Sequence, residues 1–175
     1  LPTMLDVASH FPKYQPVIAG APGIDPDYYK RYTGSRYVKI VFNRTYDLLE
    51  HADAALVTSG TATLETALFK VPQVVCYDFP GGKAVNFIFK YLFHIPYISL
   101  VNLIATQAVV KELFGALFTE KGITEELQNI LNHRAYRNAM LAGYDEVIRR
   151  MGSPGASKRT AELIYQSLMV KKKQL

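Results

Sequence analysis

The sequence has a single cysteine, Cys76, and no apolar run that reaches the roughly 18 residues of a membrane-spanning helix. A lone cysteine excludes a disulfide within the chain, which favours a reducing compartment. The four histidines and Cys76 lack the spacing of a zinc site, and no basic run is interleaved with aromatic residues as in nucleic-acid-binding proteins. We therefore expect no metal ion, no transmembrane helix and no nucleic-acid partner.

The composition is that of a folded globular chain: 49% of the 175 residues are hydrophobic and 20% are charged. This length allows one domain with a substantial core and is short for two domains of ordinary size. The net charge of +5 is modest, and part of it lies in the lysines at positions 171–173. It permits an anionic partner, such as a phosphorylated substrate or a membrane surface, without requiring one.

Short apolar runs alternate with helical patterns over most of the chain. This alternation predicts an α/β fold, with an open parallel sheet flanked by helices. From residue 107 onward the pattern is purely helical, so we divide the chain into an α/β domain, residues 1–122, and a helical C-terminal tail, residues 123–175, packed on the same domain or on a partner. Strands are expected at residues 16–19, 37–42, 54–58, 73–77 and 97–100, and helices at residues 5–11, 26–32, 45–51, 62–69, 83–93, 107–114, 123–131, 133–151 and 156–170.

One strand-to-helix turn is rich in polar chemistry: an apolar run leads into Ser59, Gly60 and Thr61 and then into a helix. The start of a helix leaves backbone N–H groups unpaired and carries partial positive charge, which favours phosphate groups. Gly60 allows close approach of a ligand, and hydroxyls, including that of Thr63, add hydrogen-bond donors. Glu65 lies on the same helix face as Thr61 and can accept both hydroxyls of a ribose. The turn is a candidate site for a nucleotide diphosphate; the alternative is an ordinary helix start whose hydroxyls only cap the backbone.

Three polar segments are expected at the same edge of the predicted sheet. Residues 59–61 follow one strand, residues 77–78 follow the next, and residues 100–102 follow a third. Ligands of open parallel sheets bind beyond the carboxyl ends of the strands, so these segments converge on one crevice. Asn102 in the third segment either contacts a ligand or satisfies backbone groups in a turn.

Five motifs follow one another in a characteristic order and spacing. They are Asp-Ala-Ala at residues 53–55, Ser-Gly-Thr-Ala-Thr-Leu-Glu at 59–65, Pro-Gln-Val-Val-Cys-Tyr at 72–77, Tyr-Ile-Ser-Leu-Val-Asn-Leu-Ile-Ala at 97–105, and Val-Lys-Glu-Leu at 110–113. The chain thereby resembles the C-terminal domain of the lipid-A-disaccharide synthases, which are glycosyltransferases of the two-domain GT-B type. The second motif is shared in looser form with other UDP-sugar transferases, whereas the fourth is more specific.

The resemblance implies a Rossmann-like, UDP-sugar-binding domain and a particular reaction. In that reaction, diacylglucosamine is transferred from UDP-2,3-diacylglucosamine to 2,3-diacylglucosamine 1-phosphate, with inversion and release of UDP, in lipid A biosynthesis. It also implies that neither a metal nor a cofactor takes part, and that the protein is cytoplasmic, with the cytoplasmic face of the inner membrane as a further option. The residues that it assigns to UDP or the donor sugar are Ser59, Gly60, Thr61, Thr63, Glu65, Asn102 and Gln107.

Two segments depart from the family pattern. Where the family usually has a glycine, a basic residue and an acid after the asparagine loop, this chain has Thr106, Gln107 and Ala108. Gln107 can still donate a hydrogen bond to a phosphate, but it lacks the charge. Residues 78–83 also differ from the basic loop that often follows the tyrosine, so the departures bear on donor affinity and not on the fold.

The resemblance places the family's N-terminal domain outside this chain, together with the catalytic base and much of the acceptor site. The first eight residues read as a helix already under way, so we expect the chain to be part of a longer protein. We therefore assign no catalytic residue within it, and we expect the chain alone to bind nucleotide weakly and to catalyse nothing.

Other functions stay open at the level of sequence. One alternative is another UDP-sugar enzyme of the same architecture, such as an epimerase or the peptidoglycan N-acetylglucosaminyl transferase; another is a non-catalytic nucleotide-binding module. The aromatic, lysine-flanked segment 83–93 is interpreted as a helix packed on the sheet, with a helix resting on the membrane surface as the alternative.

Overall fold

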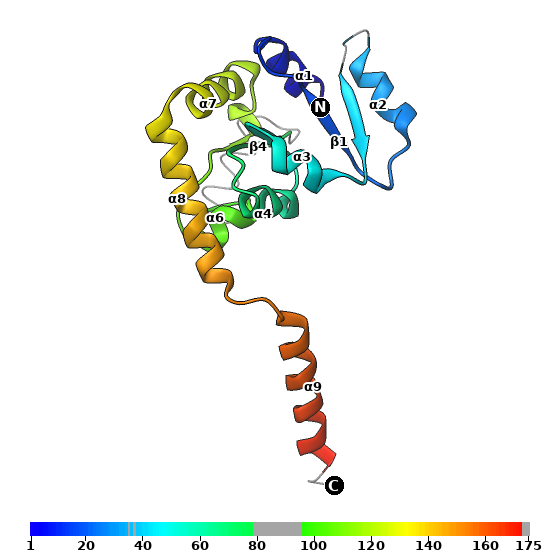
Figure 1. Cartoon of the computed structure of the whole chain (residues 1–175), viewed down its shortest axis with the longest axis vertical. Helices are drawn as coiled ribbons and strands as arrows, with labels where there is room; N and C mark the ends of the chain where they lie inside the picture. The colour runs from blue at the N-terminus through cyan, green and yellow to red at the C-terminus, as the bar shows by residue number, and fades with distance from the viewer. Residues whose placement is uncertain (35, 37, 79–95, 173–175) are drawn as a thin grey trace.

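The computed structural model describes residues 1–34, 36, 38–78 and 96–172. The paired strands are parallel and fall into two sheets, with the orders β1-β2 and β3-β4-β5. Helices flank the sheets (Figure 1), so the predicted α/β class is confirmed, with the strands divided between two sheets. The strands are β1 (Val17–Gly20), β2 (Lys39–Phe42), β3 (Ala55–Val57), β4 (Gln73–Tyr77) and β5 (Glu112–Phe114).

Side-chain caps mark the start of several helices. Asp25 accepts a 2.7 Å hydrogen bond from the N–H of Asp27, and Pro26 preorganises the first turn of the same helix. Thr119 accepts a 3.0 Å hydrogen bond from the N–H of Gly122 in the same way. The helices are α1 (Pro2–Ser9), α2 (Pro26–Thr33), α3 (Thr45–His51), α4 (Gly60–Leu68), α6 (Leu100–Ala105), α7 (Glu120–Asn132), α8 (Arg134–Met151) and α9 (Ala156–Lys172). A short 3-10 helix at Gly115–Leu117 follows β5.

The core is built around β4. Val74, Val75 and Cys76 of this strand are at most 1% exposed, as expected for a parallel strand that is covered on both faces. Helix α7 packs on β4 and α1, and α8 packs on α4, α6 and α7. Tyr144 of α8 is fully buried, and its hydroxyl lies 3.3 Å from Nε2 of Gln73 at the start of β4. The sheet and the first two helices of the predicted tail therefore share one core.

The strand predicted at residues 97–100 is wrong, because this segment leads into α6. The N–H groups of Ile98 and Ser99 donate to the carboxylate of Glu112, at 2.9 and 2.8 Å, and not to a neighbouring strand. The hydroxyl of Ser99 in turn accepts a 3.4 Å hydrogen bond from the N–H of Asn102 and so caps the helix. Side-chain partners of this kind compete with sheet pairing and are not visible in an apolar pattern.

The helix predicted at residues 107–114 is also wrong. The second half of this segment is β5, which pairs in parallel with β4. The side chain of Asn102 makes hydrogen bonds with the backbone of Val109 and Val110, and these bonds hold the approach to β5 outside a helix. Two adjacent β-branched valines also favour an extended backbone.

Helix α9 lies apart from the core. Figure 1 shows it extending away from the end of α8, beyond the short linker at residues 152–155. The side chains at residues 156–167 are exposed, including the apolar Leu163, Ile164 and Tyr165. The predicted helical tail thus consists of α7 and α8 within the core and α9 outside it.

Some predictions fall on parts of the chain that are not described. The aromatic segment 83–93 with its two interpretations, the loop at residues 79–83, and residue 37 at the start of the second predicted strand lie outside the described residues. Among the helices in the described ranges, none combines the length and apolar character that crossing a membrane requires.

Candidate functional site

The turn at residues 59–61 lies at the carboxyl end of β3, where α4 begins. Ser59 occupies the N-cap position with an extended backbone, φ −128° and ψ 139°, but its side chain makes no capping hydrogen bond. The first turn of α4 also contains no acidic residue that would offset the positive end of the helix dipole. Within the described residues, no side chain caps the backbone N–H groups of this helix start, and their contact with an anion stays a prediction.

The surface above this turn is open and hydroxylated. A Cβ atom placed on Gly60 would meet no atom within 4 Å in the described structure, so a ligand can approach the backbone there. The hydroxyl oxygens of Ser59 and Thr61 lie 3.3 Å apart, and both side chains are exposed. Two hydroxyls and the free helix start thus face the same open space.

Thr63 has a different role in the structure. It is fully buried, and its hydroxyl donates a 2.6 Å hydrogen bond to the carbonyl oxygen of Gly60. The hydroxyl therefore supports the first turn of α4 from within the helix, and direct contact between Thr63 and a diphosphate stays a prediction.

Glu65 is placed one turn into α4 and is half-buried. Within the described residues, its carboxylate takes part in no ion pair and no side-chain hydrogen bond. Residues four positions apart lie on the same helix face, so Glu65 and the exposed Thr61 share a face. A carboxylate without such partners can accept hydrogen bonds from the hydroxyls of a ribose.

The side chain of Asn102 makes its hydrogen bonds within the protein. Its side chain is 1% exposed, and its amide makes four hydrogen bonds. The amide oxygen accepts from the N–H groups of Val109 and Val110 at 2.8 and 2.9 Å, and the amide nitrogen donates to Val110 O at 2.8 Å and to Glu112 Oε1 at 2.9 Å. Of the two roles left open by the sequence, the structure shows the one in which Asn102 satisfies backbone groups.

Glu112, in the Val-Lys-Glu-Leu motif at residues 110–113, is a residue of this region for which the sequence predicts no role. It is the first residue of β5, and its carboxylate accepts hydrogen bonds from Ile98, Ser99 and Asn102. Burial raises the pKa of the neighbouring Tyr77 hydroxyl, and the negative charge of Glu112 raises it further. The available signal in the sequence was an acidic side chain at the start of a buried strand, where a charge needs partners.

Gln107 is not brought together with the turn at residues 59–61. The start of α6 is bound to Glu112, which is in register with Val75 and so with Val57 at the carboxyl end of β3, whereas the other end of α6 contacts Arg150 of α8. Gln107 lies beyond the opposite, carboxyl end of α6, where it is exposed and lines a shallow groove with Tyr136 and Gly143 of α8. Contact between Gln107 and a phosphate bound at α4 stays a prediction that this arrangement does not favour.

The described residues contain no group of three or more histidine, cysteine, aspartate or glutamate side chains that is arranged to hold a metal ion. Cys76 is buried, and its burial raises the pKa of the thiol to about 12. A thiol in this environment stays protonated at neutral pH and is a poor nucleophile.

The amino-acid sequence is similar to those of known proteins. The family model described as lipid-A-disaccharide synthetase matches residues 28–163. The lipid-A-disaccharide synthase of Anaeromyxobacter sp. (strain K) is 34% identical over 169 residues, which cover 93% of this chain and 44% of that protein. That of Myxococcus xanthus (strain DK1622) is 34% identical over 174 residues, covering 96% of this chain and 45% of the relative. The chain thus spans less than half the length of these curated relatives, and it belongs to the lipid-A-disaccharide synthetase family.

Proposed function

We propose that this chain is the donor-binding part of a glycosyltransferase of lipid A biosynthesis. The reaction transfers diacylglucosamine from UDP-2,3-diacylglucosamine to 2,3-diacylglucosamine 1-phosphate and releases UDP. The observation that carries the proposal is the start of α4, where an uncapped helix N-terminus, an open Gly60 and the uncommitted carboxylate of Glu65 lie in a chain of this family.

The proposed binding mode follows from the order of these groups along α4. The diphosphate accepts hydrogen bonds from the backbone N–H groups of the first helical turn and from the hydroxyls of Ser59 and Thr61. The ribose hydroxyls, one helical turn deeper, donate to Glu65. When the glycosidic bond breaks, negative charge develops on the leaving UDP, and donors that are already oriented stabilise it without reorganisation.

The chain itself supplies no catalytic base in this proposal. The base and much of the acceptor site come from the N-terminal domain of the longer protein, so the chain alone binds nucleotide weakly and does not turn over. We propose no metal and no cofactor. The acylated substrates make the cytoplasmic face of the inner membrane the expected place of action.

Isothermal titration calorimetry of the chain with UDP tests the proposal. The parent is expected to bind, and Glu65→Ala is expected to lose about 1–3 kcal/mol of binding free energy, the scale of a hydrogen bond to a charged group that is left unmade. Glu125→Ala is the matched control, because Glu125 is exposed on α7 and only loosely paired with Lys121 at 3.8 Å. No heat with the parent contradicts the proposal, and equal binding by parent and Glu65→Ala removes Glu65 from the ribose site.

A further inference from the structure

The carboxylate of Glu112 accepts hydrogen bonds from residues on both sides of the start of α6. Oε2 accepts the N–H of Ile98 at 2.9 Å, and Oε1 accepts the N–H of Ser99 at 2.8 Å. The Ser99 hydroxyl at 2.6 Å and the Asn102 amide nitrogen at 2.9 Å complete the set on Oε1. Hydrogen bonds to a charged acceptor are the stronger ones, so this single side chain fixes the first turn of α6 to the first residue of β5.

Asn102 extends this network into the loop before β5. Its amide oxygen accepts from Val109 and Val110, and its amide nitrogen bridges Val110 O and Glu112. Every hydrogen-bonding position of the amide is therefore occupied by the protein, and the side chain is buried. An amide in this state orients its surroundings and has no group left for a ligand.

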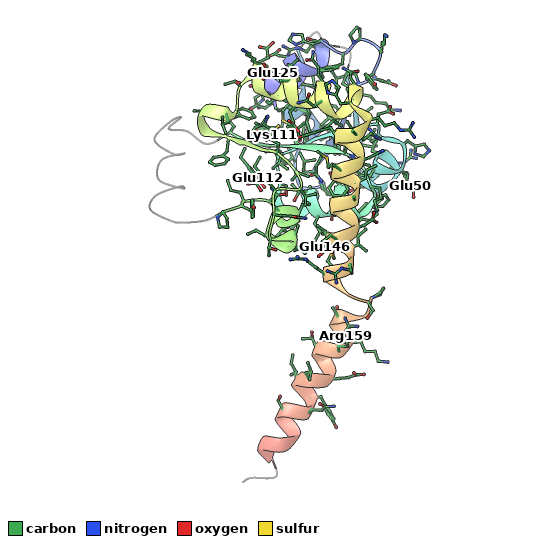
Figure 2. All side chains as sticks on the ribbon, turned by 90° about the vertical axis from the view of Figure 1, so that its left-hand side faces the viewer. Glu50, Lys111, Glu112, Glu125, Glu146 and Arg159 are labelled. Carbon is green, nitrogen blue, oxygen red and sulfur yellow. The ribbon has the colours of Figure 1, made fainter. Side chains whose placement is uncertain are left out.

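The network lies beside the candidate site. In the three-stranded sheet, Glu112 is the register partner of Val75 in β4. Val75 is in turn the register partner of Val57, the last residue of β3. Ser59, where α4 starts, is two residues beyond Val57. Helices α4 and α6 pack against each other, and the start of α6 is bound to Glu112. In Figure 2, Glu112 lies within the main body of the molecule, well away from α9, which carries Arg159.

We infer that Asn102 and Glu112 are positioning residues of the donor site, which hold the start of α6 beside the turn at residues 59–61 without touching the donor. This inference rests on the proposed function. It assigns a role to Glu112, and it replaces direct contact between Asn102 and the donor with an indirect one. The physical reason is that the Glu112 carboxylate accepts four hydrogen bonds and the Asn102 amide makes four. Together these bonds hold the start of α6 and the loop before β5 in one conformation.

Reciprocal substitution tests the inference through UDP affinity. Asn102→Asp places a second carboxylate against Glu112, and Glu112→Gln replaces one carboxylate oxygen with an amide nitrogen, which faces either the N–H of Ile98 or the donors of Ser99 and Asn102. Each change alone is expected to weaken UDP binding about tenfold, the scale of a charged hydrogen bond lost. In the double variant N102D/E112Q, the amide introduced at position 112 can donate to the carboxylate introduced at position 102. We expect that double variant to bind UDP at least as tightly as either single variant.

The possible outcomes distinguish failure of the positioning role from failure of the proposed function. If Asn102 contacts the donor itself, the two losses multiply, and the double variant binds most weakly, which overturns the inference. If the single variants melt at lower temperature but bind UDP like the parent, the network serves folding alone, and the inference is again overturned. A parent that binds no UDP overturns the proposed function, and this result is read before any variant is compared.

Two further variants keep the test decisive. Ser99→Ala removes the hydroxyl that donates to Glu112 and accepts from the N–H of Asn102, but it leaves the bond between Asn102 and Glu112 in place. It is expected to weaken UDP binding in the same direction by a smaller factor. Glu125→Gln, at an exposed position of α7, is the control for an acid-to-amide change and is expected to leave UDP binding unaltered. An unchanged UDP affinity in a folded Ser99→Ala would contradict the inference.

Discussion

The guanidinium of Arg150 donates a 2.8 Å hydrogen bond to the hydroxyl of Thr106 and a 3.1 Å hydrogen bond to Ile104 O. Thr106 closes α6 with φ 56° and ψ 25°, a left-handed conformation that costs a residue with a Cβ atom about 1–2 kcal/mol. Glycine adopts such angles without that cost. A contact from α8 thus helps to hold the strained end of α6 in place.

Thr106→Val keeps the β-branch and its strain but removes the hydroxyl, which accepts a hydrogen bond from Arg150 and donates a 2.7 Å hydrogen bond to Ala105 O. We expect it to lower the free energy of unfolding by about 1–2 kcal/mol, the usual net contribution of two hydrogen bonds. Thr106→Gly relieves the strain, and we expect it to match or exceed the stability of the parent. Chemical denaturation of the three proteins provides the measurement, and a valine variant more stable than the parent would show that the Arg150 contact contributes nothing.

Gly143 allows α8 to approach the loop before β5. A Cβ atom at this position would lie 2.4 Å from Cγ1 of Val109, too close for any real contact. Alanine is favoured over glycine within a helix by about 1 kcal/mol, but overpacking costs about 1–3 kcal/mol. We therefore expect Gly143→Ala to lower stability by up to about 2 kcal/mol.

Thermal unfolding of Gly143→Ala, Val109→Ala and the double variant tests this prediction. In the double variant the clash is relieved, so the two effects are expected to be non-additive, with the pair more stable than the sum of the single losses implies. Additive losses would show that the cost of Gly143→Ala does not come from a clash with Val109.

Gly60→Ala separates ligand binding from folding at the candidate site. The added methyl group meets no atom of the described structure within 4 Å and sits in the first turn of a helix, so the melting temperature is expected to stay the same or rise slightly. The same methyl group occupies the space that the proposed diphosphate needs. We expect UDP affinity to fall at least about tenfold, as for one charged hydrogen bond lost, and calorimetry measures it. Unaltered affinity would place the nucleotide elsewhere.

Glu146 makes the stability of the folded chain depend on pH. Hydrogen bonds from Arg149 and Arg150, at 2.7 and 2.5 Å to Oε1, hold the pKa of this carboxyl at about 2, below its usual 4.5. Since the pKa is lower in the folded chain, the stabilisation is fully present above about pH 4.5 and is lost as the pH falls toward about 2.

The stability of Glu146→Gln is expected to lie below that of the parent at neutral pH, with the gap closing as the pH falls through this range. Melting temperatures between pH 2 and pH 7, taken at low and high salt, provide the measurement, because the pairs are exposed and salt weakens them. A gap that does not vary with pH would mean that the arginines do not favour the ionised form.

Local signals in the sequence were sufficient for much of this molecule. The predicted helix at residues 45–51 and the predicted strand at residues 73–77 agree with α3 and β4 to the residue. The turn at residues 59–61 was recognisable because a buried strand, small hydroxylated residues and a helix start are all properties of adjacent positions. For the same reason the α/β class followed from the alternation of short apolar runs with helical patterns.

The structure decided what depends on residues far apart in the sequence. Residues 97–100 and 107–114 were assigned to the wrong elements because Glu112 and Asn102 bind backbone groups several residues away, and no local pattern records such partners. The same long-range bonds turned Asn102 inward, and the direction of α6 carried Gln107 to the opposite edge of the sheet from α4. The sequence by itself determined which groups are available for a nucleotide, since donors, hydroxyls and carboxylates belong to residue types. Only the tertiary structure decided which of these groups face open space and which are consumed by the fold, because burial and hydrogen-bond partners come from packing.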